Sequence, residues 1–579
     1  MPAAALRSCI ILLVRADTSG GDLSVQLRDY ANPPARGKGL HVVEGASRPS
    51  LLARPDVRYA AALAAAVALG GLVRASFVLG ADFPLNDGGM FFVMARDLQA
   101  NGYALPGFTA YNGGEIPFAY PPLGIYAAAL FADLTPVSML DAFRFLPLLV
   151  STFSIVAFFL LARTMLSTRV AVVVAVTAFA LVPRSFIWMI MGGGITRSFG
   201  FVFAILTVQQ ALLLYTRGGR RHAALAACLG ALTLLSHVEM AWFAAFSCGL
   251  LFAIHGRSRG GVISSAAVAA GVLVLAAPWW ANVLAQHGIE PFVAAADTRS
   301  PEANPVVLLI QFRMTAEPLF PLIATLAALG AFACMVNRQY VLPVWVAACA
   351  LLDPRGFGTV ASVPIALLAG IAVQDVLVPF LHHPARTALS AGSDDLLVPR
   401  LRPGAPAWLL PSGGVIMACY ALIGTLVAAP TLLTGLAPDE RDAMAWVAAS
   451  TPEAARVLVV SGEAWDGDRT SEWLPALAGR RSVATVQGRE WLREPAFDAQ
   501  IHAHRAVQEC AQADAACLTN WARDTGRTFD FVYLPRLSPR TPPSAEGDEC
   551  CPALRASLFA DTAYRVVYDG PGATVFAKR

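Results

Sequence analysis

Residues 261–281 read GVISSAAVAAGVLVLAAPWWA, a run of 21 residues without a charged side chain. An apolar helix of about 20 residues is long enough to cross the roughly 30 Å hydrocarbon core of a bilayer. Over the whole chain 56% of the residues are hydrophobic and only 14% are charged, whereas soluble domains carry about 25% charged residues. The sequence therefore predicts a polytopic α-helical membrane protein.

Similar apolar runs recur on both sides of this segment, and we expect about eleven transmembrane helices. The predicted spans are approximately 58–80, 143–162, 169–188, 198–215, 222–236, 240–254, 261–281, 318–335, 340–352, 359–381 and 408–430. The run 118–132 is also apolar, but counting it as a span would place the arginine cluster at 217–221 outside. Because short cytoplasmic loops are enriched in Lys and Arg, we interpret 118–132 as a re-entrant or interfacial helix.

The arginine-rich linkers also predict the orientation in the cell membrane. If they lie inside, the N-terminus is cytoplasmic and everything after about Thr434 is extracytoplasmic. Residues 1–57 are polar and basic, without an apolar core long enough for a cleavable signal, and we expect a disordered cytoplasmic tail. The transmembrane domain then covers 58–433, and 81–142 form its first extracytoplasmic loop. The net charge of +3 is too small to indicate nucleic-acid binding.

The polar C-terminal region, 437–579, is predicted to form a small extracytoplasmic α/β domain. Asp439–Ser450 is a plausible helix, because Pro438 stands where a helix can start, and Phe497–Ala522 also has helical character. We expect short strands at 456–461, 482–486, 530–534, 564–568 and 573–576. Glycines follow several of these strands but form no GxGxxG, so the pattern gives little support for a nucleotide site.

Four cysteines of this region predict disulfides. Cys510 and Cys517 can close a short loop, and Cys550 or Cys551 is available for a second bond. Disulfides persist in oxidising compartments, which fits the predicted extracytoplasmic location. A zinc site is less well supported, because the spacing C-x6-C followed by CC is not a usual ligand pattern.

Two segments on the predicted outer side combine charge with glycine. Asp87 follows the first span and precedes Gly88-Gly89, which leave room for close approach of a substrate; its alternative role is an N-cap of the next helix. Arg197 follows Gly192–Gly194 at the outer start of a helix. Free amides and a guanidinium there could face one phosphate, although an interfacial arginine can also snorkel toward the headgroups.

Five further residues complete the candidate substrate-binding set. Arg355, in Asp353-Pro-Arg-Gly-Phe-Gly, is a second candidate for binding the phosphate. His237 and Glu239 stand at an outer helix junction, where ionisable groups at membrane depth favour function. Glu115 and Tyr120 lie in the first loop. Tyr120 opens a Tyr-Pro-Pro segment that also forms a rigid turn.

The order of these elements resembles a known family. A first span is followed by a long outer loop with an early aspartate, then by Tyr120-Pro121-Pro122-Leu123, by Arg144-Phe-Leu-Pro and by a span that ends in Leu161-Ala-Arg. This arrangement resembles the GT-C superfamily, which includes protein O-mannosyltransferases, lipid A aminoarabinose transferases and catalytic subunits of oligosaccharyltransferases. The resemblance covers approximately residues 58–380.

The resemblance implies a GT-C-like membrane glycosyltransferase. Its donor would be a polyprenyl-phosphate sugar, and its acceptor a glycan, a lipid or a protein at the extracytoplasmic face. The family's loop aspartate serves as catalytic base or metal ligand, a role that maps onto Asp87. The family's DxD or ExD doublet is absent, because Leu85 stands two residues before Asp87 and Gly89 stands two residues after it. Dependence on a divalent metal therefore stays open.

Two other functions remain as alternatives, a transporter or flippase with an outer accessory domain and a non-catalytic GT-C-like scaffold. A transporter should carry a continuous polar path through its spans, with its site near the midplane. Only isolated charges such as Arg74 and Asp375 stand inside the predicted spans. This pattern favours the enzyme, in which a base accepts the acceptor proton and cations hold the leaving phosphate.

Overall fold

The computed structural model describes residues 55–297, 304–382, 409–428, 433–493, 496–536 and 550–579. The chain divides into two compact units, Met1–Ala62 and Leu63–Arg579. In the first unit only the start of helix α2 (Pro55–Leu79) is described, so the predicted tail 1–57 lies almost wholly outside the described residues. All that follows concerns the second unit.

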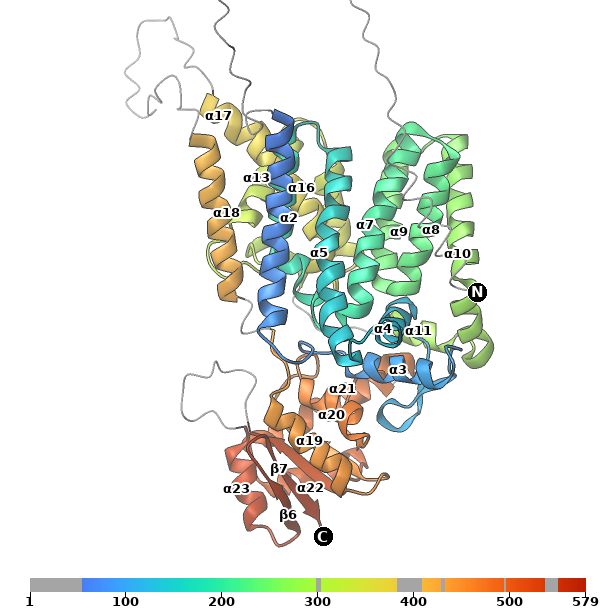
Figure 1. Cartoon of the computed structure of the whole chain (residues 1–579), viewed down its shortest axis with the longest axis vertical. Helices are drawn as coiled ribbons and strands as arrows, with labels where there is room; N and C mark the ends of the chain where they lie inside the picture. The colour runs from blue at the N-terminus through green and yellow to red at the C-terminus, as the bar shows by residue number, and fades with distance from the viewer. Residues whose placement is uncertain (1–54, 298–303, 383–408, 429–432, 494–495, 537–549) are drawn as a thin grey trace, which may run out of the picture. The chain divides into compact units, whose positions relative to one another are not determined.

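Helices dominate the second unit up to residue 428 (Figure 1). Helix α7 packs against α5, α8 and α9, and α13 packs against α16. The helices that follow α2 in this region are α3 (Gly89–Ala100), α4 (Leu123–Leu134), α5 (Met139–Met165), α6 (Arg169–Leu181), α7 (Gly194–Arg217), α8 (Arg220–Ser236), α9 (Val238–His255), α10 (Arg259–His287), α11 (Glu290–Asp297), α12 (Pro305–Ile310), α13 (Leu322–Val336), α14 (Val341–Leu352), α15 (Phe357–Val360), α16 (Ser362–Ala372), α17 (Val378–His382) and α18 (Leu409–Ala428).

Six helices of the described residues are long and apolar enough to cross a membrane, or seven with one bent pair. These helices support a membrane protein that crosses the bilayer several times. Four further apolar helices are shorter, among them α4 and α13. The predicted count of about eleven spans is therefore not confirmed.

The segment of the predicted span 169–188 is bent and is not one straight helix. Helix α6 ends at Leu181, and the segment Pro183–Met189 continues at an angle of 78° to it. Proline has no backbone N–H and its ring collides with the carbonyl four residues earlier. The helix therefore breaks at Pro183, although the hydropathy of the segment stays high.

The C-terminal residues form a five-stranded mixed sheet with strand order β4-β3-β5-β7-β6. Strand β3 is parallel to β4 and β5, and β7 is antiparallel to β5 and β6. The strands are β3 (Arg456–Val459), β4 (Arg481–Ser482), β5 (Phe531–Pro535), β6 (Tyr564–Asp569) and β7 (Ala573–Lys578). The accompanying helices are α19 (Pro438–Ser450), α20 (Arg469–Ala478), α21 (Ala496–Glu509), α22 (Ala515–Thr525) and α23 (Pro552–Ala560).

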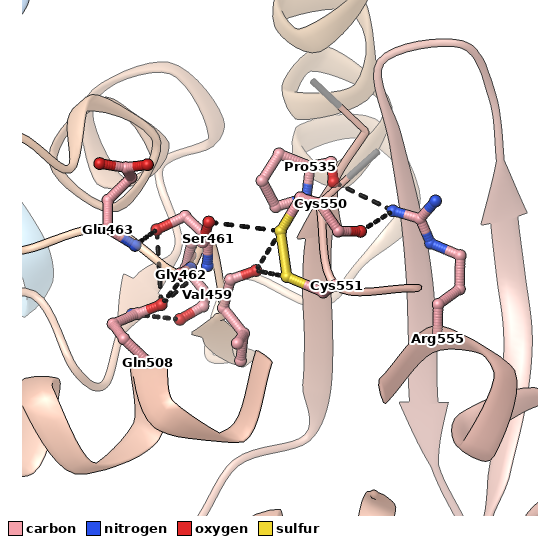
Figure 2. Close-up of a disulfide and its surroundings, with 10 residues drawn as sticks. Val459, Ser461, Gly462, Glu463, Gln508, Pro535, Cys550, Cys551 and Arg555 are labelled. Atoms are coloured by element: carbon pink, nitrogen blue, oxygen red, sulfur yellow. Dashed lines mark hydrogen bonds between the residues drawn. A yellow bond between two sulfur atoms is a disulfide. The ribbon is translucent and has the colours of Figure 1, made fainter. Parts of the chain in front are cut away.

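Two disulfides lie in the core of this sheet region. Cys510 is bonded to Cys517 with a Cα–Cα separation of 5.7 Å, and Cys550 is bonded to its neighbour Cys551. The Cys550 sulfur lies 3.3 Å from the carbonyl oxygen of Ser461, in the loop that follows β3 (Figure 2). The structure thus joins all four cysteines of the region, and the oxidising compartment stays a prediction.

The first loop and the sheet region share one hydrophobic core. Phe83 and Met94 from the loop pack in the same buried cluster as Trp473 of α20 and Tyr533 of β5. The loop also contains a two-stranded ribbon of β1 (Phe108–Thr109) and β2 (Ile116–Pro117). Because Phe83, Trp473 and Tyr533 are at most 1% exposed, the core holds the loop against α20, which Figure 1 shows next to α3.

Candidate active site

The carboxylate of Asp87 binds the start of helix α7. Its Oδ1 accepts a hydrogen bond of 2.8 Å from the backbone N–H of Gly193, and its Oδ2 accepts one of 2.8 Å from Nη1 of Arg197. Helix α3 begins at Gly89 with Gly88 as its N-cap and without a side-chain cap. The alternative role of Asp87 as the N-cap of this helix is therefore wrong.

Glycines allow this close approach. A Cβ at Gly192 would lie 2.0 Å from the carbonyl oxygen of Asp87, and a Cβ at Gly193 would lie 2.5 Å from its Oδ2. Gly88 has a φ of +119°, a conformation that side chains with a Cβ rarely adopt. The glycines on both segments therefore determine where the carboxylate sits.

We expect Gly193→Ala to lower turnover at least about tenfold, because the added methyl group takes the place of the Asp87 carboxylate. The φ of −66° at Gly193 suits alanine, so the backbone itself should not be strained and the melting temperature should change little. The control is Gly249→Ala in α9, where a Cβ meets nothing within 4 Å. Equal turnover of both variants and the parent in a donor-consumption assay would refute the steric argument.

Helix α20 holds the backbone on both sides of Asp87. Glu472 accepts a hydrogen bond of 2.8 Å from the N–H of Gly88, and Nε1 of Trp473 donates to the carbonyl of Asn86 at 2.9 Å. Glu472 is 4% exposed. Burial and the charge of Asp87 raise the pKa of Glu472 to about 8, so this second carboxyl is largely protonated at neutral pH.

Arg197 contacts both Asp87 and the ring of Trp188. Its guanidinium stands 5.4 Å from the ring centroid of Trp188, a geometry that favours a cation. The side chains of Arg197 and Asp87 are 24% and 19% exposed. The ion pair is thus only partly exposed to water, and the planar guanidinium retains further N–H donors for a ligand.

Tyr120 joins the first loop to the rest of the site. Its ring packs edge to face on Phe91, on His237 and on Trp491, with centroid distances of 4.6, 6.0 and 5.5 Å. Burial raises its pKa to about 12, while the charge of Arg197 opposes the shift. Tyr120 is therefore a neutral hydroxyl at the centre of the cluster.

A second group of charges combines Glu239, in the first turn of α9, with Asp353 at the end of α14. Asp353 and Glu239 both face Gly356, where a Cβ would lie 2.5 Å from Oδ2 of Asp353 and 2.6 Å from Oε1 of Glu239. Burial and the charge of Glu239 raise the pKa of Asp353 to about 7. Like charges so close favour a shared proton. Nδ1 of His237, two residues before Glu239, is buried without a hydrogen-bond partner among the described residues.

Most of the predicted substrate-binding residues lie in this neighbourhood. Asp87, Arg197, Tyr120 and His237 are linked by the contacts above, and Arg355 influences the pKa of Asp353. Glu115 is not brought into the cluster, because it makes an exposed ion pair of 3.3 Å with Arg481.

Among the described residues no three His, Cys, Asp or Glu side chains gather as a metal site. A metal ligand role of Asp87 therefore stays a prediction, as do the other assigned roles. Glu472, Asp353 and Trp491 are residues of the cluster that the sequence motifs do not indicate.

This chain is similar to known proteins in its fold and not in its sequence. No protein-family model and no curated protein matches the sequence. The archaeal oligosaccharyltransferase AglB from Archaeoglobus fulgidus, in complex with an inhibitory peptide and a dolichol-phosphate, is 14% identical. The match covers 82% of this chain and 69% of that chain with a TM-score of 0.50.

Two further solved structures are similar over more of the chain. The arabinofuranosyltransferase AftD from Mycobacteria is 16% identical, with a TM-score of 0.52; the match covers 89% of this chain but only 40% of that chain. ArnT from Cupriavidus metallidurans, bound to undecaprenyl phosphate, is 12% identical over 89% of this chain and 97% of that chain, with a TM-score of 0.51. The predicted resemblance to the GT-C superfamily is confirmed at the level of the fold.

Proposed function

We propose that this chain is a membrane glycosyltransferase that transfers a sugar from a polyprenyl-phosphate donor to an acceptor at the extracytoplasmic face. The observation that carries the proposal is the partly shielded Asp87 carboxylate, held by Gly193 and Arg197 in a GT-C fold. Two of the similar structures contain dolichol-phosphate or undecaprenyl phosphate, which supports a lipid-phosphate donor. The N-terminus is then cytoplasmic and the sheet region extracytoplasmic.

The residues suit the chemistry of sugar transfer to a hydroxyl. Asp87 serves as the base that accepts the acceptor proton. The remaining N–H groups of Arg197 and the guanidinium of Arg355 stabilise the negative charge of the leaving phosphate. The neutral hydroxyl of Tyr120 orients the sugar.

The test is consumption of a radiolabelled polyprenyl-phosphate sugar by the purified full chain in nanodiscs, with release of free lipid phosphate as the readout. Several sugars and a membrane extract as the source of acceptor are needed, since neither substrate is identified. Lipid movement between leaflets without cleavage would instead support a flippase, and inertness toward all donors would support a scaffold.

We expect Arg197→Ala to raise the donor KM about ten- to hundredfold, because a charge-assisted hydrogen bond to phosphate contributes about 1.5–3 kcal/mol. The matched control is Arg441→Ala, since Arg441 also forms an ion pair with a first-loop carboxylate, Asp82, and is equally exposed at 24%. A fall in kcat without a change in KM would contradict a phosphate contact and assign Arg197 to positioning Asp87.

A further inference from the structure

A cavity of about 330 Å³ in the sheet region is lined by four arginines. Arg456 and Arg481 stand at the first residues of β3 and β4. Arg489 begins a short helical turn, and Arg527 follows α22. The volume lies within the range of small-ligand pockets, about 300–1,000 Å³. We call this space the arginine cavity.

Two of the four arginines are paired with carboxylates. Arg456 forms a two-point ion pair with Asp530, at 2.7 and 3.1 Å. Arg481 forms the exposed pair with Glu115. Their hydrogen bonds hold the two guanidinium groups at the wall of the cavity.

Arg489 and Arg527 have no carboxylate at ion-pair distance among the residues that the structure describes. Nε of Arg489 is buried and makes no hydrogen bond within that part of the chain. Arg527 donates from Nη1 to the backbone carbonyl of Val483 at 3.1 Å. Both guanidinium groups therefore keep donors that a ligand can use.

The cluster is electrostatically unfavourable by itself. Burial and the charge of Arg481 lower the pKa of Arg489, and burial and the charge of Arg489 lower that of Arg527. A bound anion would remove this repulsion and satisfy the buried donors. Guanidinium groups bind phosphate in a two-point geometry that is matched to its oxygens.

The position of the cavity points to the acceptor side of the reaction. Arg489 stands two residues before Trp491, whose ring packs on Tyr120 of the candidate active site. The donor phosphate is expected at Arg197, the first-turn arginine of the apolar helix α7. The arginine cavity belongs instead to the sheet region, and Arg481 at its wall is exposed, so a ligand can enter from water.

We propose that the arginine cavity binds a phosphate ester carried by the acceptor and so anchors it beside the site of sugar transfer. This inference rests on the proposed function in one respect, because only a sugar transferase has an acceptor. The anion site itself stands on the four arginines and is testable without turnover.

The experiment titrates the full chain, in nanodiscs of neutral lipid, with inorganic phosphate and separately with glucose 6-phosphate. We expect saturable binding of both by calorimetry, and an affinity at least about tenfold lower in Arg489→Gln/Arg527→Gln. The control is Arg505→Gln/Arg523→Gln, which removes two exposed arginines of α21 and α22 and should bind like the parent. In phosphate-free buffer of low salt the melting temperature of Arg489→Gln/Arg527→Gln should be no lower than that of the parent, because the substitutions remove the repulsion between the arginines.

Three results would overturn the inference: no saturable binding by the parent, equal affinity of the cavity variant and the parent, or binding of inorganic phosphate without the ester. Failure of the proposed function looks different. If the parent binds both probes but cleaves no lipid-phosphate sugar, the proposed glycosyltransferase activity and the assignment of the ligand to the acceptor are both refuted. The arginine cavity then remains an anion-binding site. Retained binding by a turnover-deficient Asp87→Asn variant supports both proposals.

Discussion

Asp87→Asn lowers turnover of the polyprenyl-phosphate sugar by about 10²-fold or more, if Asp87 is the base of the transfer. The amide oxygen of asparagine can still accept the hydrogen bond from Gly193, but it cannot take a proton as a carboxylate does. The folded structure should persist, because the substitution keeps the volume of the side chain. The measurement is donor consumption in nanodiscs, with the melting temperature taken beside it.

Asp82→Asn is the matched control for this experiment. Asp82 stands five positions earlier in the same loop, is 63% exposed and pairs with Arg441. Its substitution should leave turnover near that of the parent. Full activity of Asp87→Asn would refute the assignment and favour Glu239, which shares its surroundings with Asp353. A chelator added to the parent enzyme separates a base from a metal ligand.

The sequence predicts that Asp87 and Arg197 lie on the same side of the membrane. The two residues lie 110 positions apart, yet the positive-inside rule places both at the outer ends of spans. The glycines beside each of them indicate that backbones approach closely. What the sequence does not predict is their contact with each other: the amide and guanidinium expected for a phosphate bind the carboxylate of Asp87.

The contribution of the sheet region could not be predicted. Glu472 stands in the first turn of α20, where an acidic residue is ordinary because it favours the helix dipole. Its partner, the N–H of Gly88, lies 384 positions away, and no periodicity or motif links the two. Hydropathy likewise does not indicate the break at Pro183, because an average over a window of residues contains no information on backbone geometry.

Glu472→Gln should stabilise the protein in alkaline solution by on the order of a few kcal/mol. In the folded chain the pKa of Glu472 is raised to about 8, from an ordinary value of 4.5. Between these two values the folded state holds a proton that the unfolded chain releases. The stability of the parent therefore falls as the pH rises from about 4.5 to about 8, and stays low above it.

The glutamine variant lacks this titration while its amide oxygen can still accept from Gly88. The difference in melting temperature between variant and parent should thus be small at pH 5, and should be largest near pH 9. Glu440, whose pKa burial raises to about 7, titrates in both proteins and so cancels in the difference. Glu509→Gln, an exposed change on α21, should run parallel to the parent at every pH. Parallel curves for Glu472→Gln as well would mean that Glu472 ionises at its ordinary pKa, and that Asp87 has a second negative charge beside it at neutral pH.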